Sequence, residues 1–344
     1  MVQSWRERML EQLRALQLDQ QKLVRMTGEL PASLNPYIDD GVVFKAAMLY
    51  GETFNSKVQV GYEMLWEGIA SGKITELTTV IAASSGNTGL GLALLCKLLG
   101  LKCRIIVAND VPSSKVGLIT ALGSPIEVVL HTSKDESTVT RARREGLGDG
   151  CFDTDQYANP ANLDAQCKYL APQLWATNQE GINIVVVASG TLGTAGGIKR
   201  YVEKRDLGAT VVLAVCAPDE EVPGARTKES IRRDVKTARL EDFLHIEMGE
   251  RYQSFLASYA LQAIAPLTPP GPTSGLAFLG ALRFVDRIRG AGVLDQFRGS
   301  DNIVRVVFLC PDDYRLYSDL YRSELKGRNF AGDRVDSKEL LLQK

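Results

Sequence analysis

The sequence predicts an α/β protein of two doubly wound sheet domains, each with a mostly parallel sheet covered by helices. Short apolar segments alternate with helical segments along most of the 344 residues, a pattern typical of parallel sheets. The alternation falls into two series, one before and one after residue 156, which favours two sheets. Two expected strands run directly into turns rich in glycine and hydroxyl side chains, each followed by a helix.

The first series begins with an amphipathic helix expected over 3–25 and a strand over 42–49. A β-branched apolar run at 79–83 predicts a buried strand, and the leucine-rich stretch 90–99, which stops before Gly100, predicts a buried helix. By the same criteria, strands are expected over 104–108 and 126–130, and helices over 58–70, 115–121 and 134–145.

The second series begins after Gln156. It predicts helices over 163–176 and 194–204 and strands over 182–188 and 210–216. The pattern weakens between 218 and 270, where the charged stretch 227–239 predicts either a solvated surface helix or a lid that shapes substrate choice. The expected division is a smaller domain over 45–155, a larger domain over 1–44 plus 156–330, and a tail over 331–344.

Composition excludes several classes of function. The net charge of −1 gives no reason to expect nucleic acid or an anionic membrane as partner, and no apolar run approaches the ~20 residues of a membrane span. The six cysteines lack the spacing of a zinc site, and their apolar surroundings favour reduced thiols in a cytoplasm. With only His131 and His245 present, we expect no metal site and no Ser-His-Asp triad.

The first glycine-rich turn follows the strand expected over 79–83. It consists of Ser84, Ser85, Gly86, Asn87, Thr88 and Gly89. Backbone N–H groups at a helix N-terminus, together with hydroxyl side chains, form an anion site. The turn lacks the lysine of a P-loop and the spacing of a dinucleotide fingerprint, so a small anion such as a carboxylate is the expected ligand.

The second turn spans 189–197, after the strand expected over 182–188. Gly190 and Gly193 allow the backbone to close tightly, and Thr191 and Thr194 add hydroxyl donors, which suits a phosphate. A plain strand-to-helix turn is the alternative for either segment taken alone.

Lys57 lies at the expected start of the helix over 58–70, where the helix dipole disfavours a cation. This position suits an amine that must lose its proton to attack a carbonyl group. Lys45 is the rival candidate, but it lies within an expected strand. A lysine, a carboxylate turn and a phosphate turn, in this order, indicate an enzyme that uses pyridoxal 5'-phosphate (PLP).

Several motifs resemble those of the cysteine synthase (O-acetylserine sulfhydrylase) and cystathionine beta-synthase family of fold-type II PLP enzymes. They are KLVRM at 22–26, SK at 56–57, SSGNTG at 84–89, QYANPAN at 156–162, GTLGTAG at 190–196, GPTSG at 271–275 and PDDYRLY at 311–317. The chain departs from the family in two places. Val58-Gln59 stands where an Asp-Arg pair usually follows the lysine, and 218–270 holds no counterpart of the QGIG loop.

The resemblance implies a role for each motif. Lys57 would hold PLP as an internal aldimine and then remove the substrate α-proton. The turn with Gly190, Thr191, Gly193 and Thr194 would bind the PLP phosphate, Thr273 would meet the pyridine nitrogen, and Asn87 would hydrogen-bond the 3-oxygen. Ser84, Ser85, Gly86, Asn87, Thr88 and Gln156 would hold the substrate carboxylate. Arg226 would contact a phosphorylated or other anionic substrate, unless it belongs to a solvated charged face.

The implied reaction is β-replacement or β-elimination on an activated serine such as O-acetylserine or O-phosphoserine. It would pass through an aminoacrylate intermediate and give cysteine or another β-substituted alanine, with cofactor and substrate in the cleft between the domains of a homodimer subunit. Two alternatives stay open: a serine or threonine dehydratase-type lyase, and a catalytically silent relative that acts as a binding partner.

Overall fold

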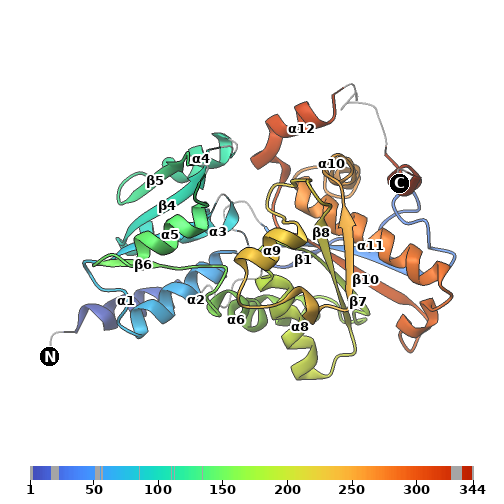
Figure 1. Cartoon of the computed structure of the whole chain (residues 1–344). Coiled ribbons are helices and arrows are strands. Elements are labelled where there is room, and N and C mark those ends of the chain that lie inside the picture. The colour runs from blue at the N-terminus through green and yellow to red at the C-terminus, as the bar shows by residue number, and fades with distance from the viewer. Residues whose placement is uncertain are drawn as a thin grey trace.

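A computed structural model describes residues 3–16, 23–50, 55, 57–84, 86–109, 111, 113–133, 135–326 and 335–342. It contains two sheets, which Figure 1 shows on opposite sides of the molecule. The four-stranded sheet has the order β5-β4-β3-β6, and the six-stranded sheet has the order β1-β2-β10-β7-β8-β9. The α/β class and the two-sheet architecture are therefore confirmed.

The smaller sheet is parallel throughout. Its strands are β3 (Thr79–Ala83), β4 (Lys102–Ala108), β5 (Ile126–His131) and β6 (Cys151–Asp153). The associated helices are α1 (Trp5–Ala15), α2 (Lys57–Ala70), α3 (Asn87–Leu99), α4 (Ser113–Thr120) and α5 (Thr138–Gly146). Side chains of β3 alternate between two cores: Val80 packs on the α1, α2 and α3 side, and Ile81 packs with Val139 of α5. Both faces of this sheet are thus buried, as expected for parallel strands.

The larger sheet is parallel except for its first strand. Its strands are β1 (Arg25–Met26), β2 (Val42–Met48), β7 (Ile184–Ala188), β8 (Thr210–Cys216), β9 (His245–Gly249) and β10 (Val304–Cys310). α10 (Arg251–Ala260) and α11 (Pro272–Gly290) contribute to one core, in which Phe278 packs near Phe308. α7 (Ala171–Ala176) and α8 (Gly193–Arg205) contribute to the other, where Val187 and Leu213 are buried.

The remaining elements of the described residues are all short. They are α6 (Ala161–Ala165), the π-helix η1 (Gln166–Leu170), α9 (Lys228–Asp234), the 3₁₀ turns η2 (Leu240–Asp242), η3 (Leu261–Ala263), η4 (Leu294–Phe297) and η5 (Tyr314–Tyr317), α12 (Ser318–Glu324) and α13 (Ser337–Leu342). No helix among the described residues has the length and apolar character needed to span a bilayer.

Three sequence-based expectations differ from the structure. The helix expected over 3–25 begins with a capping box at Ser4 but ends at Ala15, and Arg25–Met26 pairs antiparallel with β2. The weak region 218–270 contains β9 and α10, which the sequence analysis missed. The expected domain boundary at residue 45 lies inside β2, which pairs over its whole length with β10 of the larger sheet, while α1 packs in the core of the smaller sheet.

The close approach of α10 and α11 depends on Gly275. A Cβ atom at this position would overlap the carbonyl oxygen of Ser254 and approach the backbone nitrogen of Ser258 to 2.6 Å. Gly290, at the other end of α11, has no neighbour within 4 Å of such an atom.

Gly275→Ala should therefore lower the free energy of unfolding by about 1–3 kcal/mol or more, because backbone atoms on α10 must shift. Gly290→Ala is the matched control and should change it by about 0.5 kcal/mol or less. Urea denaturation measures both variants, and equal stabilities would contradict the proposed close contact.

Candidate functional site

A cavity of about 830 Å³ lies between the two sheets. The residues that follow β3, β7 and β10 line it, as expected for a ligand site beyond the carboxyl ends of parallel strands. Four helices, α2, α3, α8 and α11, begin at or within two residues of the lining. Their N-terminal ends give the cavity a partial positive potential that favours anionic ligands.

Lys57 is the first residue of α2, and its amine lies in this cavity. Its Nζ donates a hydrogen bond to Oγ1 of Thr194, at 3.1 Å, and its backbone N–H donates to Oδ1 of Asn55 at 2.9 Å. Burial lowers the pKa of the Lys57 amine to about 8, because a low-dielectric site disfavours the charged form. A substantial fraction of this amine is consequently neutral near pH 8.

Lys45, the rival lysine, lies elsewhere. It is on β2, outside the cavity lining, and its Nζ forms an ion pair with Glu180 at 3.0 Å. The glutamate side chain is 60% exposed, so this is a surface pair. The geometry therefore favours Lys57 as the reactive amine.

The first glycine-rich turn connects β3 to α3 and lines the cavity through Ser84, Gly86, Asn87 and Thr88. The backbone N–H of Gly89 donates to Oγ of Ser84 at 2.9 Å, which closes the turn. Ser85, which the sequence analysis assigned to the same anion site, lies outside the described residues. Gln156 is buried beside the turn, and its Nε2 donates to the carbonyl oxygen of Ala83 at 2.8 Å.

The second turn connects β7 to α8 and contributes Gly190, Thr191 and Thr194 to the cavity. Oγ1 of Thr191 accepts hydrogen bonds from Nδ2 of Asn162 (2.7 Å) and from the backbone N–H of Gly193 (3.4 Å). Its own hydroxyl hydrogen can therefore point toward a ligand.

Asn162 is a support for this turn that the sequence analysis did not single out. Its Nδ2 also donates to the backbone oxygen of Gln156, so it connects the two predicted anion sites. Gly193 packs against it, and a Cβ atom at Gly193 would overlap the Asn162 amide. The sequence signal that could have identified Asn162 is the QYANPAN motif at 156–162, of which it is the last residue.

Thr273 lies in the first turn of α11 and also lines the cavity. Thr273 is 3% exposed, and its Oγ1 has no hydrogen-bond partner among the described residues. Buried hydroxyl groups are normally paired, so this one is suited to a polar atom of a ligand.

Asp312 is a cavity residue that the sequence analysis quoted within PDDYRLY at 311–317 but did not assign to the site. It follows β10 and is 3% exposed. Its Oδ2 accepts hydrogen bonds from Nδ2 of Asn87, at 2.9 Å, and from the hydroxyl group of Tyr317. This carboxylate thus connects the end of the larger sheet to the start of α3.

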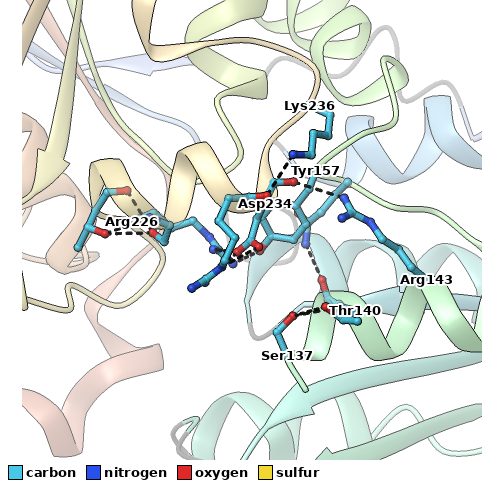
Figure 2. A network of polar contacts seen from close by, with 12 residues as sticks. Ser137, Thr140, Arg143, Tyr157, Arg226, Asp234 and Lys236 are labelled. Atoms are coloured by element: carbon cyan, nitrogen blue, oxygen red, sulfur yellow. Dashed lines mark hydrogen bonds and ion pairs between the residues drawn. The ribbon is translucent and has the colours of Figure 1, made fainter. Parts of the chain in front are cut away.

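Arg226 lines the cavity but is engaged by other side chains, as Figure 2 shows. Its Nη1 forms an ion pair with Asp234 at 2.5 Å, its Nη2 donates to the hydroxyl oxygen of Tyr157 at 2.9 Å, and its guanidinium lies 4.6 Å from the centre of that ring. Burial acts to raise the pKa of Asp234, but hydrogen bonds from Arg233 and Arg226 outweigh it and hold the pKa below its ordinary value. Arg226 does not belong to a solvated charged face, the alternative considered from the sequence.

The chain belongs to the family of pyridoxal-phosphate dependent enzymes, whose model matches residues 34–264. It is 24% identical to cysteine synthase B of Salmonella typhimurium over 69% of this chain and 78% of that protein. It is also 29% identical to cystathionine beta-synthase of Apis mellifera over 43% of this chain, a match that spans 30% of the relative's length.

Solved structures with this fold include an O-acetylserine dependent cystathionine beta-synthase from Helicobacter pylori, with a TM-score of 0.71 at 21% identity over 88% of this chain and 96% of that chain. An O-ureido-L-serine synthase aligns with a TM-score of 0.73 at 15% identity over 93% of this chain and 96% of that chain. These likenesses support the fold-type II architecture that the motifs predicted.

The residues present fit PLP, the cofactor of this family. The cavity offers a buried amine with a lowered pKa, a glycine-rich turn at the start of α8, and the unpartnered hydroxyl group of Thr273. These suit the aldehyde, the phosphate and the pyridine nitrogen of PLP in turn.

The lowered pKa of Lys57 predicts how fast the apoprotein captures PLP covalently. Only the neutral amine attacks an aldehyde, so the capture rate should rise with pH up to about 8 and level off above it. Absorbance after rapid mixing of apoprotein with PLP measures the rate at each pH.

Free Nα-acetyl-lysine has an amine with an ordinary pKa near 10.4. The rate at which it reacts with PLP should therefore still increase above pH 9 under the same conditions. Lys57→Arg should abolish covalent capture and Lys45→Arg should leave it unchanged. Borohydride reduction and peptide mapping identify the modified lysine, and a pyridoxyl group on Lys45 would disprove the assignment.

Proposed function

We propose that this chain catalyses β-replacement or β-elimination on an activated serine such as O-acetylserine or O-phosphoserine, giving cysteine or another β-substituted alanine. The observation that carries the proposal is the buried amine of Lys57, with its pKa lowered to about 8, in one cavity with both glycine-rich turns. The cysteine synthase and cystathionine beta-synthase relatives support the same class of reaction.

Lys57, Asn87, Thr273 and the turn from Gly190 to Thr194 are the residues proposed to hold PLP. When bound, PLP withdraws electrons from the substrate α-carbon, so that the α-proton becomes acidic and the β-substituent can leave. The neutral Thr273 hydroxyl beside the pyridine nitrogen would leave that nitrogen unprotonated, which suits elimination and replacement better than transamination.

The other proposed roles concern the amino-acid substrate. Nζ of Lys57 accepts the α-proton as general base, a role that its lowered pKa suits near neutral pH. Ser84, Ser85, the backbone N–H groups from Gly86 to Thr88 and the second N–H of the Gln156 side chain bind the substrate carboxylate. The first N–H of Gln156 orients the amide through Ala83.

Arg226 is proposed to contact an anionic leaving group at the part of the cavity that Tyr157 and Asp234 also line. Asp234 and Tyr157 each take one of its terminal nitrogens, and a guanidinium carries five N–H donors, so donors are left for a phosphate.

Three further proposals concern the domains of the protein, its oligomeric state and its location in the cell. The two sheets mark two domains with the cofactor between them, the protein is a homodimer, and it is cytoplasmic. All six cysteines are free thiols in the structure, which supports a reducing compartment.

The reaction is tested by incubating PLP-loaded protein with O-acetylserine or O-phosphoserine and measuring released acetate or phosphate. We expect release by the wild type and none by Lys57→Arg. Gln156→Ala should raise KM while the absorbance of bound PLP stays the same, because Gln156 is assigned to substrate. Absence of release from both substrates would contradict the proposed function.

Arg226→Ala should lower kcat/KM about tenfold or more for O-phosphoserine and leave O-acetylserine unaffected, because the lost contact is to a phosphate. Arg233→Ala is the matched control, since Arg233 also pairs with Asp234 but its side chain is 68% exposed. An equal change on both substrates in Arg226→Ala would assign Arg226 a purely structural role.

A further inference from the structure

Asp312 lies where the two sheets meet in the cavity. Its backbone oxygen accepts a hydrogen bond from the N–H of Gly271 at 2.9 Å, which fixes it next to the start of α11 and hence near Thr273. A Cβ atom at Gly224 would contact Cγ2 of Thr273 at 3.4 Å and lie 3.9 Å from the hydroxyl oxygen of Tyr317, the donor to Asp312. Asp312, Tyr317 and Thr273 are therefore neighbours in one wall of the cavity.

Asp312 also determines the orientation of the Asn87 amide. Nδ2 of Asn87 donates to Oδ2 of Asp312 at 2.9 Å, so the nitrogen of the amide and not its oxygen faces this carboxyl group. At the other end, Oδ1 of Asn87 accepts from Nδ2 of Asn55 at 3.4 Å. One of the two N–H groups of Nδ2 is used by Asp312, and the second has no acceptor among the described residues.

We propose that Asp312 is a positioning residue of the cofactor site. By accepting one N–H of Asn87, it aims the other N–H into the cavity, where it can donate to the 3-oxygen of PLP. The Tyr317 hydroxyl group donates to the same carboxylate oxygen and keeps it in place. The inference rests on the proposed binding of PLP at Lys57, and it adds a residue to which no role was assigned from the sequence.

A purely structural role for Asp312 makes a different prediction. If the carboxylate served only to connect the end of β10 to the start of α3, its loss would lower the stability of the fold without changing the electronic environment of bound PLP. A donor to the 3-oxygen, in contrast, affects the absorbance of PLP directly, because that oxygen is conjugated with the ring.

The test compares Asp312→Asn with Asp313→Asn. The first substitution keeps the shape of the side chain but replaces one acceptor oxygen by a donor amide group, so the amide of Asn87 is no longer held in one orientation. The control changes an adjacent carboxylate that bonds Arg315, at 2.9 Å and 2.8 Å, and does not line the cavity. Equilibrium titration of apoprotein with PLP and the absorbance spectrum of the bound cofactor are the readouts.

We expect Asp312→Asn to weaken PLP binding about tenfold and to shift the absorbance maximum, while Asp313→Asn matches wild type in both. Tyr317→Phe should shift both quantities in the same direction by a smaller amount, because it removes a donor to Asp312 but keeps the contact of Asp312 with Asn87. If Asp312→Asn does not fold, the result for Tyr317→Phe decides, and wild-type affinity and spectrum in that variant would overturn the inference.

Two further outcomes are distinguishable. Wild-type protein that binds PLP, together with an Asp312→Asn variant of unchanged affinity and spectrum, would overturn the role of Asp312 alone. Wild-type protein that does not bind PLP would overturn the proposed function and this inference with it.

Discussion

The burial of one amine is the constraint on which the rest of the site depends. An ammonium group is costly to transfer into a low-dielectric cavity, so the fold shifts Lys57 toward its neutral form and lowers its pKa to about 8. Lys57 is also the first residue of α2, where the positive end of the helix dipole disfavours a cation. A nucleophilic amine near neutral pH follows from these two placements.

The same helix ends that disfavour a cation favour anions. α3 and α11 begin beside the cavity directly after Gly86 and Gly271, and α8 begins at Gly193. The phosphate of PLP and the carboxylate of the proposed substrate are anions of the kind that such helix ends favour. The Asn162 amide donates hydrogen bonds to both Gln156 and Thr191, so it connects the sites proposed for the two anions.

The sequence predicted the parts of this structure that local signals determine. The turns at 84–89 and 190–196 and the lysine at a helix start follow from residue type and spacing, and they all reach the cavity. β9 was not recognised because His245–Gly249 is only partly apolar, and α9 and η2 separate it in the chain from β8, the strand it pairs with. Tyr157 lies 69 residues from its partner Arg226, and Asn87 lies 225 residues from its partner Asp312. No local pattern reports such contacts.

The ion pair between Arg226 and Asp234 has a consequence for changing the substrate range of this enzyme. Asp234 is buried on the cavity side, and its partners Arg226 and Arg233 differ greatly in exposure. If a single substitution put a neutral or acidic side chain at 226, the buried carboxylate of Asp234 would lose Arg226 and keep the largely exposed Arg233 as its arginine partner. Variation of the pocket at this point should therefore occur as paired changes at 226 and 234, and libraries that randomise both positions together should yield more folded proteins than libraries that randomise one.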